Sequence, residues 1–163
     1  MIRNNTISPA EADLAWMRIA IDKAVEAESR GEVPVGAVVV VRQQIAGSAG
    51  NNPISGHDPT AHAEILALRE AARTMSNYRL VGATLYVTLE PCIMCMGAII
   101  QARIGRLVYG ADDPKSGAAG SVYSIGQDGL LNHRLEIRKG VLAPQCSQLL
   151  QDFFRRKRRK DES

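Results

Sequence analysis

Apolar residues near the start of the chain recur with the spacing of a helix. Leu14, Met17 and Ile21 would share one helical face. They follow Ser-Pro-Ala-Glu at residues 8–11, which offers a capping hydroxyl, a proline at the first helical position and a glutamate three residues after the cap. Gly31 is a stop signal. We therefore expect the chain to open with a helix between these two signals.

A run of four valines, residues 38–41, is too apolar for a strand that has one face in water. We expect residues 34–41 to form a central strand of a sheet. Residues 42–44 then indicate a turn into a second strand, which runs from Ile45 to about Asn51. The two strands would form an antiparallel hairpin.

Helical and strand patterns alternate along the rest of the chain. The expected helices are residues 61–75, with Thr60 as the cap, 92–102 and 147–154. The expected strands are residues 81–88, 106–109 and 135–141. The segments between them that are broken by proline and glycine, and are expected to be loops, are residues 52–60 and 111–132. This alternation predicts an α/β fold, a three-layer α/β/α sandwich in which helices cover both faces of a largely parallel sheet.

The composition is that of an ordinary globular protein, since 45 % of the 163 residues are hydrophobic and 23 % are charged. The formal charge is +3, but residues 155–160 supply six positive charges in one run. Without residues 155–163, 14 basic residues stand against 15 acidic ones. A uniformly basic protein is therefore excluded, and we expect one domain at residues 1–154 followed by a basic tail at residues 155–163.

The chain shows no signal for a membrane or for secretion. It contains no run of about 18 apolar residues, and residues 1–15 lack the apolar centre of a signal peptide. Cys92, Cys95 and Cys146 are an odd number with two close together, which favours thiolate chemistry in a reducing compartment over disulfides. Cys146 has no partner motif and is expected to be buried. The expected location is the cytoplasm.

One histidine and two cysteines close to expected helix starts could hold a metal ion. His62 opens the sequence His-Ala-Glu, and Cys92 and Cys95 belong to Pro-Cys-x-x-Cys. One imidazole and two thiolates leave the fourth tetrahedral position to water, as in catalytic zinc sites. Glu64, which is not one of these ligands, is the candidate general base and acid. Two residues of ideal helix turn a side chain through about 200°, so His62 and Glu64 can converge only at a helix end.

Further motifs surround these residues. They are EVPVGA at residues 32–37, HDPTAHAE at 57–64, NYRL at 77–80, YVTLEPC at 86–92, GAAGS at 117–121 and NHR at 132–134. On these motifs the chain resembles the bacterial tRNA-specific adenosine deaminases over nearly its whole length, within the wider group of zinc nucleobase deaminases. The resemblance implies a cytidine deaminase-like fold with a five-stranded mixed sheet between helical layers. It also implies hydrolytic deamination of adenosine to inosine at the wobble position of a tRNA anticodon, by zinc-activated water.

The same resemblance implies partners and roles for particular residues. It implies one Zn²⁺ per subunit, a homodimer and a tRNA anticodon stem-loop as the substrate. Asn51 would hydrogen-bond the base, and the backbone amide of Ala63 would contact the rim of the purine. Asp113 would lie near the ribose of the target nucleotide, and Val33 would line the pocket.

Two residues depart from the pattern of the family next to these positions. Gly50 precedes Asn51 where relatives often carry a bulkier residue, and Met96 follows Cys95 where a small one is common. The shape of the pocket is therefore left open by the sequence.

The basic tail suits a substrate rich in phosphate. The residues expected to contact the tRNA backbone are Arg155, Arg156, Lys157, Arg158, Arg159 and Lys160. Two other functions stay open. One is a zinc-dependent deaminase of a free nucleobase or nucleoside, of guanine, cytosine or cytidine type, which would need no RNA hairpin. The other is a non-catalytic zinc- or RNA-binding module, which would tolerate loss of Glu64.

Overall fold

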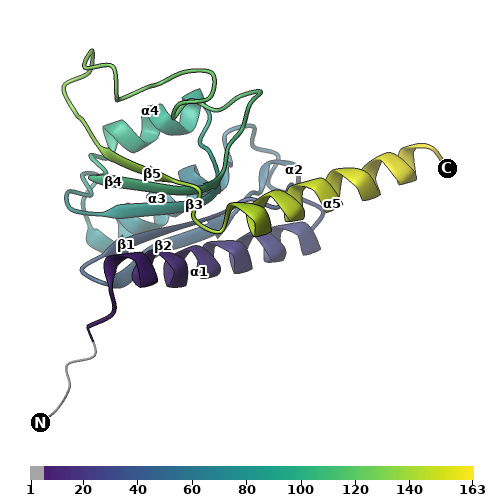
Figure 1. Ribbon diagram of the computed structural model, residues 1–163, viewed down its shortest axis with the longest axis horizontal. Coiled ribbons are helices and arrows are strands. Elements are labelled where there is room, and N and C mark those ends of the chain that lie inside the picture. The colour runs from purple at the N-terminus through teal and green to yellow at the C-terminus, as the bar shows by residue number, and fades with distance from the viewer. Residues whose placement is uncertain (1–5) are drawn as a thin grey trace, which may run out of the picture.

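Five strands form one sheet in the order β2-β1-β3-β4-β5 (Figure 1). The structure is a computed structural model that describes residues 6–163. Its strands are β1 (Gly36–Val41), β2 (Gln44–Gly50), β3 (Thr84–Leu89), β4 (Arg106–Ala111) and β5 (Glu136–Lys139). Its helices are α1 (Pro9–Ser29), α2 (Pro53–Gly56), α3 (Ala63–Met75), α4 (Ile93–Gln101) and α5 (Ala143–Asp161). The elements follow the expected order with α2 added, and the five strands match the five expected strands.

The sheet is mixed, so the prediction of a largely parallel sheet from the alternation of elements was wrong. β1 pairs antiparallel with β2 and with β3, whereas β3–β4 and β4–β5 are parallel. β1 and β2 are antiparallel because a tight hairpin joins them, whereas the strand–helix–strand connection from β3 to β4 gives a parallel pair. The mixed sheet is the one that the family resemblance implies.

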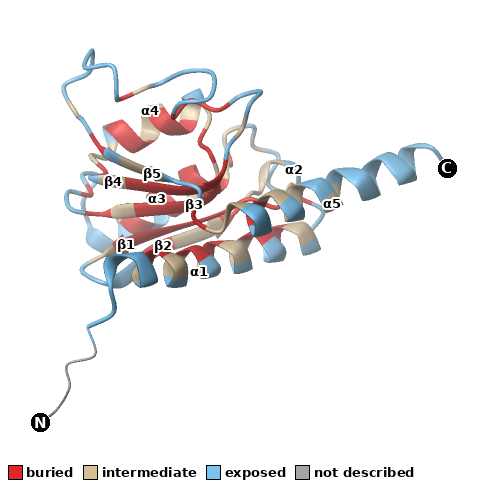
Figure 2. Ribbon diagram, viewed as in Figure 1, coloured by how far each residue is buried: buried red, intermediate tan, exposed pale blue. Residues whose placement is uncertain are grey.

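Two helical layers cover the sheet and complete the three-layer sandwich. α1 and α5 pack on one face through a core that includes Met17, Val38 and Cys146. α3 and α4 pack on the other face through a larger core that includes Leu85 and Ile99. Figure 2 shows the buried sheet between the two layers and the exposed far end of α5, which projects from the body.

The start of the chain and the first hairpin confirm the sequence predictions. Ser8 caps α1, with its hydroxyl accepting a hydrogen bond from the Glu11 N–H while the Glu11 carboxylate accepts one from the Ser8 N–H. Arg42 and Gln43 form the turn between β1 and β2 with positive φ angles of 49° and 61°. Positive φ angles at both turn residues are typical of a tight antiparallel hairpin, although the asparagine or glycine that usually adopts them is absent from this turn.

Several boundaries differ from the predictions, and three of the differences concern helices near the site or the basic run. Residues 53–56, expected as loop, form the single turn α2, which begins at a proline. His62, not Thr60, is the N-cap of α3, because the Thr60 hydroxyl is engaged with Asp58 at 2.7 Å. α5 begins four residues before the expected start and continues to Asp161, so the basic run is helical.

The register brings the candidate residues to one end of the sheet. The carboxyl ends of the parallel strands β3 and β4 lie side by side, and they lead to Cys92 and Asp113. Because β1 is antiparallel to β3, its amino end, after Val33, lies there too. Gly50 pairs with Gly36, so the end of β2 and the following Asn51 reach the same place. Functional side chains often gather at such strand ends.

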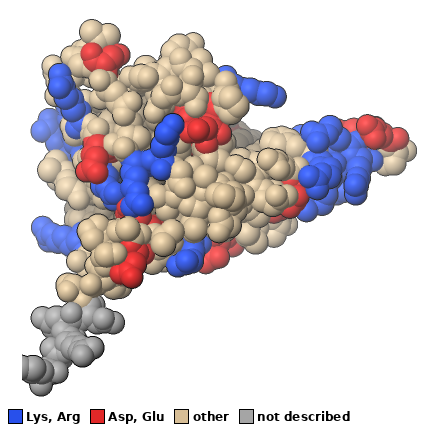
Figure 3. Space-filling model, viewed as in Figure 1, with Lys and Arg blue, Asp and Glu red and all other residues tan. Residues whose placement is uncertain are grey.

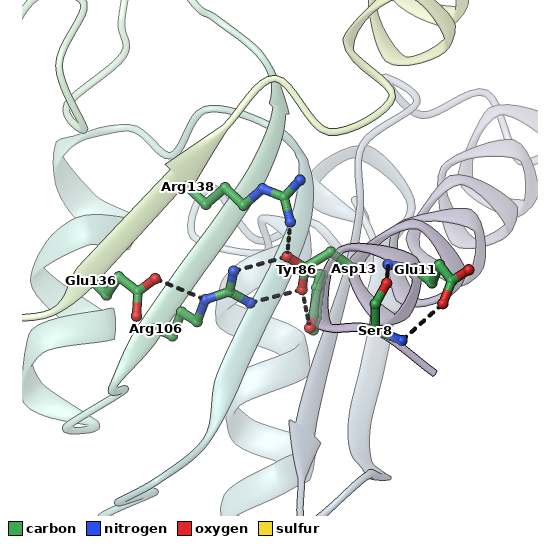
Figure 4. A network of polar contacts seen from close by, with 7 residues as sticks. All are labelled: Ser8, Glu11, Asp13, Tyr86, Arg106, Glu136 and Arg138. Carbon is green, nitrogen blue, oxygen red and sulfur yellow. Dashed lines mark hydrogen bonds and ion pairs between the residues drawn. The ribbon is translucent and has the colours of Figure 1, made fainter. Parts of the chain in front are cut away.

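A buried acidic side chain fixes α1 to the sheet near the other end of β4. Asp13 is 1 % exposed. Its carboxylate accepts hydrogen bonds from Arg106 at 2.7 and 2.8 Å, from the Tyr86 hydroxyl at 2.8 Å and from Arg138 (Figure 4). Burial opposes the charge of Asp13, but these hydrogen bonds outweigh it and hold the pKa of Asp13 below its usual value.

In residues 6–163, none of the helices combines the length and the apolar character needed to cross a bilayer.

Candidate active site

The three expected metal ligands converge. The Nδ1 atom of His62 lies 3.6 Å from the Cys92 sulfur and 3.5 Å from the Cys95 sulfur. A zinc ion bonded to one nitrogen and two sulfurs in a tetrahedron requires nitrogen–sulfur separations of about 3.6 Å. The ligand atoms all lie within 4.8 Å of one another. The donor set and its spacing therefore fit a zinc ion.

Two helix starts create this convergence. His62 is the N-cap of α3 and Cys92 the N-cap of α4, and both have extended backbone conformations. An extended N-cap residue breaks the helical rotation between its side chain and those that follow. His62 can thus face the two sulfurs while Glu64, two residues further on, also turns inward.

Glu64 is buried beside the ligands. It is 4 % exposed, and burial raises its pKa to about 7, against the opposing effects of Cys95 and His62. A carboxyl group with a pKa near neutrality can both accept and release a proton under ordinary conditions. The position and the pKa both suit the general base and acid expected from the sequence.

The two cysteines share the site unequally. A hydrogen bond from Cys95 is the main reason why the pKa of Cys92 falls to about 3, and His62 acts in the same direction. The hydrogen bond with Cys92, together with burial, raises the pKa of Cys95. A separate contact, between the His62 ring and the Cys92 sulfur, raises the pKa of His62. The lowered pKa of Cys92 favours its thiolate, which is the form of cysteine that binds metals.

Asn51 and Ala63 lie together at the start of α3. The Ala63 N–H donates a hydrogen bond of 2.9 Å to the Asn51 side-chain oxygen. Since His62 makes no side-chain cap, Asn51 replaces it as the acceptor for this helix end. The Asn51 oxygen is thus engaged by the chain itself, which leaves the side-chain NH₂ group to donate to a ligand.

Val33 and Asp113 share a groove. Its volume is about 770 Å³, and besides these two residues it is lined by the loop at residues 112–116 and by Phe154, Arg155 and other residues of α5. The Asp113 carboxylate accepts hydrogen bonds from backbone N–H groups within the same loop, at 3.1 and 3.2 Å. The groove therefore joins two expected pocket residues to part of the basic run.

The basic residues of α5 divide into separate sets. Arg155 and Arg158 line the groove beside Asp113. Arg156, Lys157 and Lys160 line a second hollow, of about 580 Å³, against the end of α1, where Arg156 pairs with Glu28. Arg159 is exposed and is not among the residues that line these two hollows. Figure 3 shows how Lys and Arg side chains gather on the projecting end of α5.

Gly50 and Met96, the two residues that depart from the family pattern, contribute to the packing of the helices on the sheet. A Cβ atom at Gly50 would lie 2.8 Å from the Ala27 Cβ atom, so this glycine allows β2 to approach α1, on the sheet face away from α3. Met96 is fully buried in the core beneath α4. Cys146 is 1 % exposed and unpaired, as expected.

Two buried glutamates near the site were not singled out from the sequence. Glu32 is 1 % exposed, and its carboxylate accepts hydrogen bonds from the Ser55 N–H at 2.7 Å and the Ile54 N–H at 3.3 Å, which holds the first turn of α2. Glu90 is 2 % exposed and binds Ser121. Their only signal was their place in the motifs EVPVGA and YVTLEPC.

Comparisons with known proteins agree with this geometry. The family model described as MafB19-like deaminase matches residues 11–158. A relative from Haemophilus influenzae named tRNA-specific adenosine deaminase is 53 % identical over 150 residues, which cover 91 % of this chain and 87 % of the relative.

Two solved structures are also similar. One, from a study of A-to-I editing by tRNA:A34 deaminases at the wobble position of transfer RNA, is 41 % identical with a TM-score of 0.81, over 83 % of this chain and 99 % of that one. A guanine deaminase from Bacillus subtilis is 38 % identical with a TM-score of 0.59, over 60 % of this chain and 63 % of that one. The chain therefore belongs to the deaminase family and, within it, to the tRNA-specific adenosine deaminases.

Proposed function

We propose that the protein deaminates adenosine to inosine at the wobble position of a tRNA anticodon. The observation that carries this proposal is the convergence of His62, Cys92 and Cys95 beside the buried Glu64. A groove lined by Val33, Asp113 and two arginines of α5 adds a basic wall for RNA. The names of the related proteins support the choice of substrate.

In this proposal His62, Cys92 and Cys95 hold one zinc ion per subunit. When bound, zinc activates water as a nucleophile near neutral pH. Glu64 takes a proton from the water that adds to C6 of the adenine and delivers it to the ring nitrogen. Glu64 then assists the departure of ammonia, so that inosine remains. Its pKa of about 7 suits both directions of proton transfer.

Four residues would orient the target nucleotide, and two of them, Val33 and Asp113, line the groove. The free NH₂ group of Asn51 can donate to a purine nitrogen. The Ala63 amide would have to exchange its bond with Asn51 for one to the base, because an N–H carries a single proton. Val33 would pack on the base, and Asp113 would lie near the ribose.

The experiment that tests this function compares substrates. We expect inosine to form in an anticodon stem-loop that carries adenosine at the wobble position, and not from free adenosine, cytidine or guanine, when products are separated by chromatography. Turnover of a free base or nucleoside alone would keep the mechanism and replace the substrate. Zinc-loaded protein without any turnover would instead indicate a binding module.

The six basic residues should contribute unequally to the affinity for the RNA hairpin. We expect Arg155→Ala with Arg158→Ala to weaken binding of the RNA hairpin and to reduce the slope of log affinity against log salt by roughly one to two units, because each lost phosphate contact removes about 0.7–0.9 unit. Arg159→Ala is the matched control, because this residue is exposed outside both hollows.

Removal of residues 155–163 should lower affinity and salt slope further and leave the zinc content unchanged. This result would also support the proposal that residues 1–154 form the deaminase domain and that the basic segment acts as an RNA contact. Titrations at several salt concentrations give both quantities, and an unchanged slope in the double variant would refute the contact.

We also propose that the protein is a cytoplasmic homodimer. An apolar groove between α3 and α4, lined by Ile65, Leu68 and Ala98 among others, offers a surface for a second copy, and Tyr78 beside it is 70 % exposed. Light scattering would measure the mass in solution, and a monomer at micromolar concentration would contradict the dimer. The three free cysteines suit a reducing compartment.

A further inference from the structure

A buried carboxylate lies between the metal-ligand turn and the loop that leads from Asp113. Glu90 follows β3 and stands two residues before Cys92. Its side chain accepts a hydrogen bond of 2.6 Å from the Ser121 hydroxyl and one of 3.3 Å from the Ser121 N–H. Such bonds to an ionised oxygen are stronger than neutral ones.

The loop is shaped around this carboxylate. A Cβ atom at Gly117 would overlap the Glu90 side chain, so only glycine lets the loop pass so closely. The Gly117 N–H donates to the Asp113 carbonyl at 2.9 Å, and the next residue, Ala118, donates its N–H to the Pro91 carbonyl at 2.8 Å. A continuous set of short contacts therefore links Asp113 to the segment that carries the metal ligands.

Glu90 is not among the residues that line the groove, whereas Asp113 is. It is also not one of the three converging metal ligands. A contribution of Glu90 to the reaction is therefore indirect, and the loop that it holds is the route that leads to the groove.

We propose that Glu90 is a positioning residue, which fixes residues 113–121 so that Asp113 stands at the wall of the groove when the substrate RNA binds. The proposal rests on the proposed function for its substrate, but its structural part concerns the loop alone. It assigns to Glu90 an effect on substrate binding that is separable from metal binding.

The test is a double-mutant cycle between Glu90 and Asp113. Glu90→Gln keeps the size of the side chain and removes its charge. We expect it to raise KM for the RNA hairpin about ten-fold, with kcat changed less than about three-fold and zinc content unchanged. Asp113→Ala should raise KM in the wild-type background, and should add little when Glu90 is already replaced, because the loop is then misplaced.

Two controls separate positioning from general destabilisation. Asp13→Asn also removes a buried carboxylate, but at the distant contact of α1 with the sheet. Any effect of Asp13→Asn on KM should be additive with the effect of Asp113→Ala. Ser121→Ala removes the hydroxyl that donates to Glu90 and should raise KM by less than Glu90→Gln does. Kinetics are measured below the melting temperatures of all variants.

Hydrogen exchange gives a readout that needs no turnover. Glu90→Gln should speed exchange of the Ala118 and Ser121 amides at least about ten-fold, without a comparable change in β1. If the wild type fails to act on the RNA hairpin, the proposed function falls while this measurement still tests the loop.

The positioning role would be overturned by any of three results: unchanged exchange in the loop, additive effects of Glu90→Gln and Asp113→Ala, or Asp113→Ala without effect on KM. Loss of zinc from Glu90→Gln would also overturn it, since it would show that Glu90 supports the metal site and not the groove.

Discussion

Replacement of Glu64 by alanine should abolish deamination and leave zinc in place. Glu64 is buried beside the ligands with a pKa of about 7, but it is not among the three residues whose donor atoms converge. Loss of a general acid and base costs about 10²- to 10⁴-fold in rate, so turnover of the RNA hairpin should fall by at least about 10²-fold. Inosine formation and zinc content, measured on the same sample, check both parts.

Two further variants make this result specific. Glu64→Gln keeps the volume of the buried side chain and should be equally inactive, which excludes a cavity as the cause. Cys92→Ser should lose both metal and activity, because it removes a ligand. Wild-type turnover in zinc-loaded Glu64→Gln would refute the proton-transfer role. Loss of zinc from Glu64→Ala would indicate that the glutamate supports zinc binding.

Replacement of Asp13 by asparagine should cause the largest loss of stability among the polar variants considered. Its carboxylate neutralises Arg106 and Arg138, and removal of one partner from a buried ion pair costs about 3–5 kcal/mol. Both arginines are partly exposed, so the lower end of this range applies. The melting temperature should fall by roughly 10 °C, since about 1 kcal/mol shifts it by 2–4 °C in a protein of this size.

The neighbouring Glu136 provides the matched control. It pairs with the same Arg106 at 3.3 Å, but its side chain is 69 % exposed, so Glu136→Gln should cost less than about 1 kcal/mol. Similar losses in the two variants would show that burial of Asp13 is not what gives the contact its strength.

At low pH the contribution of Asp13 to the free energy of unfolding should disappear. Because its pKa is lower in the folded protein than its usual value, ionised Asp13 stabilises the fold above the unfolded pKa of about 3.9, and this stability is lost as the pH falls through the folded value. The gap in unfolding free energy between wild type and Asp13→Asn should therefore narrow below about pH 4. A gap that stays constant down to about pH 2 would contradict the assignment.

Most elements could be predicted from the sequence because their signals are local. The cap at Ser8 and the valines at residues 38–41 depend only on neighbours in the chain. The sense of pairing was missed because β1 meets β3 only after β2 and α3 have intervened, and periodicity carries no strand direction. The cap of α3 was missed because its acceptor, Asn51, is eleven residues before His62.

The convergence of His62, Cys92 and Cys95 could be predicted because their types and spacing are chemically restrictive. Whether His62 and Glu64 face the same point depended on the helix end, which only the folded backbone decides. The role of Gly50 also needed the structure, because it is set by Ala27 on a distant helix. Likewise, six basic residues in a row look equivalent until α5 turns them toward different neighbours.

Because the three candidate ligands lie at two helix starts, a metal ion bound there would also act as a cross-link. His62 and Cys92 are 30 residues apart, and an ion between them would tie the first turns of α3 and α4 together on a single face of the sheet. Such a cross-link stabilises the fold chiefly by lowering the conformational entropy of the unfolded chain. Removal of the metal should therefore destabilise the elements that it joins more than the rest of the protein. The layer of α3 and α4 would loosen first, while α1, held by Asp13 on the opposite face, would keep its place on the sheet.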